Sequence, residues 1–218
     1  MAVSLSIIAA GTIGNYSDLE NKVALWLDRD DLNDRIPDFI ALMEAEANRL
    51  LRTVNQEVPD IWVTASETYL LPADFRRLRK IFIDGNPDRP LVEMSPISVP
   101  QRYSGDPGTP EAYYIEGRSI SFAPPPAAQT TFRVTYFRKI PPLTSAAPSN
   151  WMLEEHPDIY LWGTLEQAAI YIRDEDAIAL CGQKFQTAIA ELQRESRMDR
   201  WAGPLVPNNV RQVRGAPC

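Results

Sequence analysis

The chain has 218 residues with 29 acidic and 22 basic side chains, and its net charge of -7 argues against a protein that grips a phosphate backbone. Its hydrophobic content of 44% is typical of a folded protein that buries a sizeable core. The two cysteines, Cys181 and Cys218, give no disulfide framework and favour a reducing compartment. No stretch approaches the ~20 apolar residues of a membrane span, and the start has no basic region typical of a signal peptide. We expect a soluble, unexported protein.

The N-terminal quarter predicts an arm followed by two helices. Residues 1–16 are small, apolar and glycine-containing, which is typical of an extended arm or an edge strand. Ser17 and Glu20 have the spacing of a capping box at the start of the first helix. After an acidic link over 28–34, a second helix is expected to begin near Pro37. Its apolar residues recur on one face: Ile36, Phe39, Ile40, Met43, Ala47, Leu50 and Leu51.

The middle of the chain, residues 59–150, predicts an inserted β lobe. Residues 61–71 have the composition of a strand. A basic turn is expected to follow and to lead into the next strand, and it holds the only dense positive cluster: Arg76, Arg77, Arg79 and Lys80. In an acidic protein these side chains favour carboxylates, of the same chain or of another subunit, over nucleic acid. We therefore interpret the cluster as a candidate subunit interface.

The strongest β signal is the stretch 111–143. Alternating residues on both sides of Glu116 and Gly117 predict a tight hairpin, in which the glycine can adopt a positive φ. Three prolines, 124–126, then end the ladder. A further strand is expected from Thr131, with Phe132, Val134 and Tyr136 on one face.

Helical periodicity returns near His156 and Pro157, breaks at Arg173 and Asp174, and continues to about Met198. The predicted fold class is therefore α+β. Residues 17–58 and 151–200 would form one helical bundle, into which the small antiparallel β lobe of 59–150 is inserted, with extended arms at 1–16 and 201–218.

The last 18 residues show no period and no acidic side chain. They can be a disordered tail or an arm that folds against a partner. The candidate docking residues in this arm are Trp201, Leu205, Val206, Val210, Arg211, Val213 and Arg214.

The sequence contains no constellation typical of an enzyme. His156 is the only histidine, which excludes a multi-histidine metal site, and its place before a proline suits a helix start. Nucleotide-binding glycine motifs, the nucleophile-elbow motif and zinc-ligand spacings are absent, so no cofactor or metal is expected. Paired carboxylates, Glu154 with Glu155 or the acids of 28–34, could perform acid–base glycoside chemistry and leave a carboxylate-dependent wall-degrading hydrolase as the alternative.

Four segments together resemble the bacteriophage head-to-tail adaptor proteins. They are the capped helices of 17–53, YLLPADFRRLRKIFIDG at 69–85, GTPEAYYIEGRSISFAPPP at 108–126 and HPDIYLWGTLEQAAIYIRDEDAIA at 156–179. The resemblance runs from about Tyr16 to Arg200.

This resemblance implies a structural virion protein at the head–tail interface, assembled in the host cytoplasm. It implies a ring of twelve copies beneath the portal protein, with double-stranded DNA passing through the lumen without specific binding. The C-terminal arm would reach the portal, and the β lobe would face neighbouring subunits or tail and nozzle proteins. Exposed tryptophans would be interface anchors, although we expect Trp26 and Trp62 to be core residues.

Overall fold

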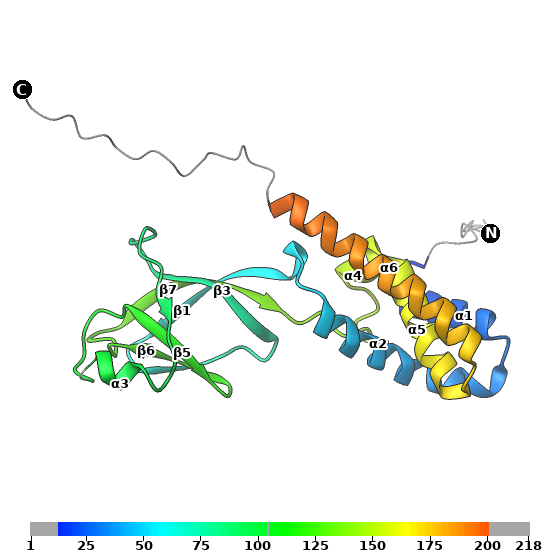
Figure 1. Ribbon diagram of the computed structural model, residues 1–218, viewed down its shortest axis with the longest axis horizontal. Helices are drawn as coiled ribbons and strands as arrows, with labels where there is room; N and C mark the ends of the chain where they lie inside the picture. The colour runs from blue at the N-terminus through cyan, green and yellow to red at the C-terminus, as the bar shows by residue number, and fades with distance from the viewer. Residues whose placement is uncertain (1–12, 104, 201–218) are drawn as a thin grey trace, which may run out of the picture.

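The computed structural model describes residues 13–200 except residue 104, and it has two parts (Figure 1). A helical bundle is formed by the first and last helices, and a β lobe formed by the middle of the chain lies beyond one end of it. The predicted α+β class, with a small and mainly antiparallel β lobe between helical segments, is confirmed. In the described part of the chain no helix is long and apolar enough to cross a membrane.

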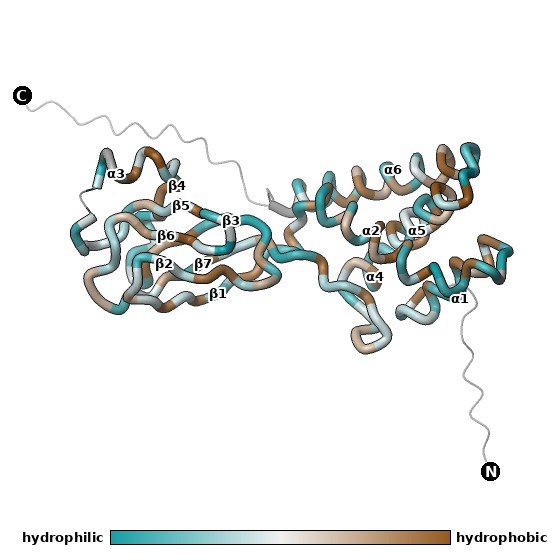
Figure 2. Tube along the Cα trace, turned by 90° about the horizontal axis from the view of Figure 1, so that it is seen from below, coloured by the Kyte–Doolittle hydropathy of each residue, from teal (hydrophilic) through white to brown (hydrophobic). Residues whose placement is uncertain are grey.

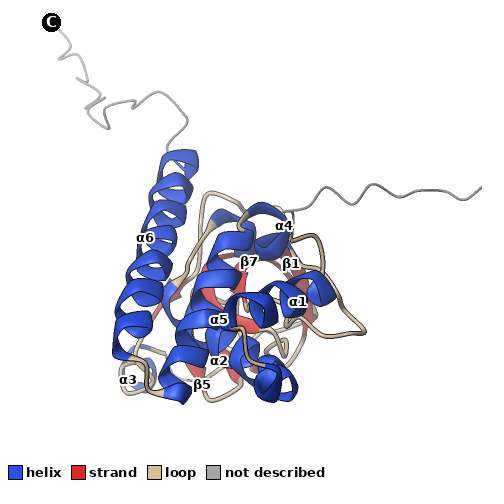
Figure 3. Cartoon of the chain, turned by 90° about the vertical axis from the view of Figure 1, so that its right-hand side faces the viewer, coloured by secondary structure: helices blue, strands red, loops and turns tan. Residues whose placement is uncertain are grey.

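The bundle is organised around one central helix. Its elements are α1 (Tyr16–Leu27), the 3-10 helix η1 (Asp30–Arg35), α2 (Ile36–Leu50), α4 (Trp151–Glu155), α5 (Pro157–Ile172) and α6 (Glu175–Arg200). Helices α1, α2, α4 and α6 all contact α5, and Figure 3 shows α6 along one side of the bundle. At the crossing, a Cβ on Gly163 would lie 2.4 Å from Cγ of Met43 and 2.8 Å from Cε2 of Phe185. Glycine therefore lets three helices approach closely.

The helix ends correct two details of the expected pattern. Helix α1 is capped by Asn15, whose side chain accepts a hydrogen bond from the backbone N–H of Asp18 at 2.9 Å, so the expected capping box at Ser17 is wrong. The N–H of Tyr16 is instead bonded to the carbonyl of Pro148, which fixes the chain before Ser17. The short helix α4 was not predicted, because five residues are too few for a helical period. The predicted helix break at Arg173 and Asp174 is confirmed, because Arg173 follows the end of α5 with a left-handed φ of 61°.

A buried carboxylate joins the two ends of the insertion inside the bundle. Glu44 of α2 accepts hydrogen bonds from the backbone N–H of Leu143 at 2.8 Å and from the hydroxyl of Tyr160 at 2.9 Å. Asn150 donates to the same hydroxyl oxygen at 2.7 Å. Burial raises the pKa of Glu44 above its usual range, although both of its hydrogen bonds act in the opposite direction. The network places the segment returning from the lobe against α2.

The β lobe consists of two small sheets packed face to face. One sheet has the order β1-β7-β3, with β1 (Glu57–Thr64), β7 (Thr130–Arg138) and β3 (Phe75–Ile83) all antiparallel. The other has the order β2-β6-β5-β4, with β2 (Thr68–Leu70), β6 (Ser119–Ala123), β5 (Ala112–Glu116) and β4 (Val92–Glu93). Only the β4–β5 pair is parallel. Helix α3 (Val99–Arg102) lies between β4 and β5 in the chain, and Gly117 supplies the predicted positive φ, 58°, in the hairpin.

Aromatic side chains form the core of the lobe. Phe122 of one sheet stacks on Phe132 of the other with ring centroids 4.2 Å apart. Trp62 is fully buried, as expected, and stacks on Tyr69 at 5.1 Å. Its indole N–H donates to Asp60 at 2.8 Å, which satisfies the polar atom of a buried tryptophan. The core of the bundle is a separate cluster, built mainly from aliphatic side chains. Along the chain trace, hydrophobic segments run through both parts (Figure 2).

Short polar contacts fix the junction between the two parts. The 3-10 helix η2 (Val54–Gln56) leads directly from the bundle into β1. The side chain of Gln56 donates to the carbonyl of Arg138 at 3.3 Å, where β7 leaves the lobe. Asn48 of α2 accepts from the N–H of Ile140 at 2.8 Å. The entering and returning segments are therefore held side by side.

Candidate assembly surfaces

The basic cluster lies within a strand and not in a turn, which corrects the sequence interpretation. Strand β3 begins at Phe75 and includes all four basic residues. Leu78 and Ile81 turn into the lobe core, and two register shifts against β7 disturb the regular alternation of the basic side chains around them. Long basic side chains are tolerated on such a strand because their charged ends can reach water or polar partners. At the bulges the strict alternation of inward and outward side chains is lost, so the sequence pattern did not show that the basic residues lie within the strand.

Arg76 is a junction residue. Its guanidinium donates to the carbonyl of Leu51 at 2.7 Å and to the carbonyl of Arg49 at 2.9 Å, both at the end of α2. These carbonyls belong to the negative end of a helix dipole, which favours a cation. Partial burial, with a smaller contribution from the nearby charge of Arg52, lowers the pKa of Arg76. Arg76 therefore links the lobe to the bundle within one chain.

The other three basic residues differ in their partners. Arg79 forms an ion pair with Glu57 of β1 at 2.9 Å, so one predicted carboxylate partner is from the same chain. The ammonium group of Lys80 lies 4.7 Å from the ring centroid of Phe82. Within residues 13–200, neither Lys80 nor Arg77 has a carboxylate at ion-pair distance, and both are exposed. Of the four, these two can best meet a carboxylate of another molecule.

The outer face of the three-stranded sheet carries a shallow, mainly apolar hollow of about 350 Å³. Ile61 and Val63 are exposed on β1, and Phe82 is half-buried on β3. Lys80 and Arg133 stand around the hollow, and Arg133 pairs with Asp84 at 2.6 Å. Asp60 also lines the hollow, but its carboxylate accepts hydrogen bonds from Ile61 and Trp62. An apolar floor with the cation of Lys80 beside it fits a partner surface that combines apolar and acidic side chains.

The β1 edge of this sheet is protected against strand addition. Pro59 of β1 has no N–H to donate, and the N–H of Ile61 is bonded to the side chain of Asp60 at 2.8 Å. Prolines and charged side chains on edge strands oppose pairing with another chain. A partner is therefore expected on the face of this sheet and not along its β1 edge.

A second apolar surface lies at the end of α1. Trp26 is 50% exposed, which contradicts the expectation of a core residue, and the adjacent Leu25 is 72% exposed. Helix α1 lies at the side of the bundle and buries only Leu19 and Val23, so Trp26 falls beside the buried stripe. Its ring makes an edge-to-face contact with half-buried Trp162 of α5 at 5.2 Å. Exposed, rigid aromatic groups of this kind are typical anchors of protein interfaces.

His156, Glu155 and Ser196 line one hollow, but their contacts are structural. We call it the junction hollow: it measures about 410 Å³ and is lined by Thr53, Val54, Asn55, Glu155, His156, Leu192, Glu195 and Ser196. The Ser196 hydroxyl accepts from the N–H of Val54 at 2.9 Å, and Glu155 accepts from the amide of Asn55. Among the described residues, no hydrogen bond joins His156 to this serine or to a carboxylate, so no activated nucleophile is assembled.

Glu154, the other carboxylate of the hydrolase alternative, accepts from the hydroxyl of Ser149 at 2.7 Å and is exposed. Asp31, in the acidic 28–34 segment, pairs with Arg29 at 2.6 Å. Hydrogen bonding to Arg29 lowers the pKa of Asp31, whereas a general acid needs a raised pKa. His156 links α4 to α5, as expected for a helix start. Within residues 13–200, no group of three His, Cys, Asp or Glu side chains is placed to hold a metal ion.

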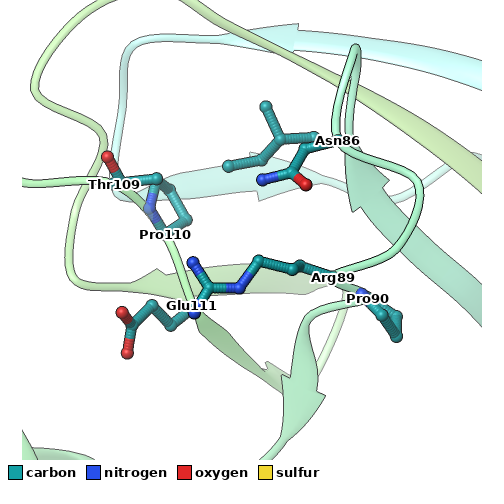
Figure 4. A pocket seen from close by; sticks show the side chains of 7 residues that line it. Asn86, Arg89, Pro90, Thr109, Pro110 and Glu111 are labelled. Atoms are coloured by element: carbon teal, nitrogen blue, oxygen red, sulfur yellow. The ribbon is translucent and has the colours of Figure 1, made fainter.

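A third hollow, of about 460 Å³, lies between the turn after β3 and the segment before β5. Figure 4 shows Arg89 extending across it, with Asn86 on one side and Glu111 on the other. Glu111 accepts a long hydrogen bond of 3.4 Å from the hydroxyl of Tyr103. One exposed guanidinium can donate to a partner, but it provides no acid–base pair for catalysis.

The predicted docking residues of the C-terminal arm, from Trp201 to Arg214, lie outside the described residues. Sequence reasoning did not identify the outer sheet face, although the alternation of Ile61 and Val63 around buried Trp62 was a usable signal. It named Trp26 but assigned it to the core. Both surfaces are exposed apolar patches.

The described residues form a helical bundle with an inserted β lobe, and they expose apolar patches on both parts. The sequence profile of the SU10 adaptor protein family matches residues 14–208. The chain therefore belongs to this family of phage adaptor proteins, which are structural components, and the resemblance seen in the sequence is confirmed. No curated protein matches the chain.

Proposed function

We propose that the chain is a head-to-tail adaptor that forms a ring of twelve copies beneath the portal protein and links the capsid to the tail. The family match over residues 14–208 is the observation that carries this proposal. The virion head–tail interface is its site of action, after assembly in the host cytoplasm. Its partners are the portal, tail or nozzle proteins and further copies of itself.

Two exposed surfaces support assembly through contacts between different faces of neighbouring copies. One is the Trp26 surface (Leu25, Trp26 and Trp162), and the other is the outer face of the β1-β7-β3 sheet with Lys80. A ring requires two different, complementary patches on each subunit. In this proposal Arg77 and Lys80 meet acidic side chains of the next subunit, while Arg76 and Arg79 serve mainly within the chain.

The distribution of charge supports passage of DNA without specific binding. Residues 13–56 and 140–200, which form the bundle and the returning segment, contain 19 acidic and 10 basic side chains. A bundle of this charge around a lumen repels a phosphate backbone and prevents adhesion of the moving DNA.

Electron microscopy of the protein mixed with its portal tests the proposal. A closed ring of twelve subunits stacked on the portal is the expected result. A protein that stays monomeric with the portal at every concentration, as measured by native mass spectrometry, would contradict it. Binding of the isolated protein to duplex DNA should remain weak, and steep salt-dependent binding would instead favour a nucleic-acid-binding module.

A further inference from the structure

The junction hollow lies at the point where the described chain ends. Three of its lining residues, Leu192, Glu195 and Ser196, belong to the last turns of α6. Glu195 is five residues before Arg200, which corresponds to about 7.5 Å along a helix. Figure 1 shows this end of α6 beside the segment that enters β1. The C-terminal arm, residues 201–218, therefore starts next to the hollow.

The hollow combines a partly apolar lining with two acidic side chains. Leu192 is buried and Val54 is half-buried, whereas Glu155 and Glu195 are exposed at the surface. Among the described residues, Glu195 has no basic side chain at ion-pair distance, and Glu155 is bonded only to the neutral Asn55. A complementary ligand would present aliphatic groups together with cations.

The C-terminal arm has this chemistry. Its charged side chains are Arg211 and Arg214, it has no acidic residue, and Val210 and Val213 stand beside the two arginines. Gly203, Pro204, Pro207, Asn208 and Asn209 precede this stretch and are residue types that favour turns. The arm can extend to about 60 Å, so its length easily allows residues 210–214 to return to the hollow.

We infer that residues 210–214 dock in the junction hollow of their own chain in the free subunit, with Arg211 and Arg214 facing Glu155 and Glu195. The docking itself does not depend on the proposed function. Only its consequence rests on that function, because a portal that captures the arm must first displace it from the hollow. The arm is then held close to the subunit before assembly and released at the portal.

Trypsin cleavage after Arg211 and Arg214, followed by mass spectrometry on the full-length free protein, tests the docking. In the double variant Glu155→Gln and Glu195→Gln, cleavage at these two sites should be about fivefold to tenfold faster than in the unmodified chain, because two exposed ion pairs are lost. Glutamine keeps the hydrogen bond from Asn55 available. Equal cleavage rates in the two proteins would overturn the inference.

A matched control carries the same change of charge outside the hollow. Glu154→Gln with Glu191→Gln alters two exposed acids that do not line it, and cleavage should stay at the unmodified rate. Equal acceleration by both double variants would assign the effect to net charge and overturn docking. Backbone hydrogen exchange of residues 208–214 provides a second measurement that does not depend on arginine, and it should speed up only in the first variant.

Dilution distinguishes docking of the chain's own arm from docking of the arm of a second copy. Protection that is unchanged on dilution supports docking within one chain, whereas protection that is lost on dilution assigns the hollow to the arm of a second copy and overturns the inference. No portal is present in these measurements. Failure of ring assembly with the portal would thus be distinguishable from failure of arm docking.

Discussion

The helical bundle and the β lobe differ in charge and in the composition of their cores. Bundle residues 13–56 and 140–200 have 19 acidic and 10 basic side chains, whereas residues 57–139 of the lobe have ten of each. The bundle core encloses a hydrogen-bonded Glu44, while the lobe core is dominated by stacked aromatic rings. The net negative charge of the protein therefore belongs to the bundle. The lobe provides a neutral body with an apolar outer face.

The two cores also differ in how they depend on the rest of the chain. The lobe is built from one continuous stretch, whereas the bundle joins α2 to helices that begin about 100 residues later. The stability of the lobe should therefore depend on substitutions within the lobe itself. The stability of the bundle should depend also on the segment that returns from the lobe. Four substitutions test this difference, in order of decreasing expected effect on stability.

The first substitution is Trp62→Ala. It removes the largest fully buried side chain among the described residues and should lower the free energy of unfolding of the lobe by about 3–5 kcal/mol. The bundle core is a separate cluster, so helical circular dichroism should change much less than near-ultraviolet signals in urea titrations. The control Ile61→Ala removes an exposed neighbour and should cost little. Simultaneous loss of both signals would show that the two parts unfold as one unit.

The second substitution is Glu44→Ala, which leaves the N–H of Leu143 and the hydroxyl of Tyr160 without their acceptor. A loss of about 2–4 kcal/mol is expected in denaturant unfolding, because two buried donors become unsatisfied. The control Glu44→Gln keeps an acceptor oxygen and should cost less.

The same residue predicts a pH dependence. The pKa of Glu44 is raised in the folded state, so the folded protein binds the proton more tightly than the unfolded chain. The contribution of Glu44 to stability should therefore decrease as the pH rises from the ordinary glutamate pKa through the raised value. Unfolding of the unmodified chain and of Glu44→Gln over this range measures the difference. If the free energies of unfolding of the two proteins changed with pH in parallel, this would contradict a raised pKa of Glu44.

The third substitution, Arg76→Ala, tests the connection between bundle and lobe. It removes two hydrogen bonds from a guanidinium to carbonyls at the end of α2, and it should cost about 1–3 kcal/mol. The junction should also become more mobile, which small-angle X-ray scattering can detect as a broader distribution of shapes. Arg77→Ala removes the same charge one residue away and should leave the junction unchanged. A similar effect of both substitutions would exclude a specific role for Arg76.

The fourth substitution, Trp26→Ala, should have the smallest effect on the isolated subunit, below about 1 kcal/mol, because the side chain is half exposed. In the proposed ring, however, it removes an interface anchor and should weaken assembly by about tenfold or more. Native mass spectrometry over a range of concentrations measures this change. Leu42→Ala, at another exposed position of the bundle, is the control. Unchanged assembly would remove the Trp26 surface from the interface.

The sequence by itself determined the order of the main helices and of the β lobe between them. Helical spacing in 36–51 and 156–198 and the turn at Gly117 reflect local periodicity and backbone preference, which do not depend on distant residues. The segments 69–85, 108–126 and 156–179 carried the family resemblance, which can likewise be seen in the local sequence without knowledge of distant contacts. Trp62 could also be assigned correctly, because tryptophan is buried on average.

Only the tertiary structure decided where the polar and aromatic side chains act. Trp26 and Trp62 are the same residue type in apolar surroundings, yet one lies at the side of the bundle and the other between two sheets. The four basic residues of β3 are adjacent in the sequence, but bulges and the end of α2 give them different partners. The junction hollow combines residues from 53 to 196, and such long-range contacts leave no local pattern in the sequence.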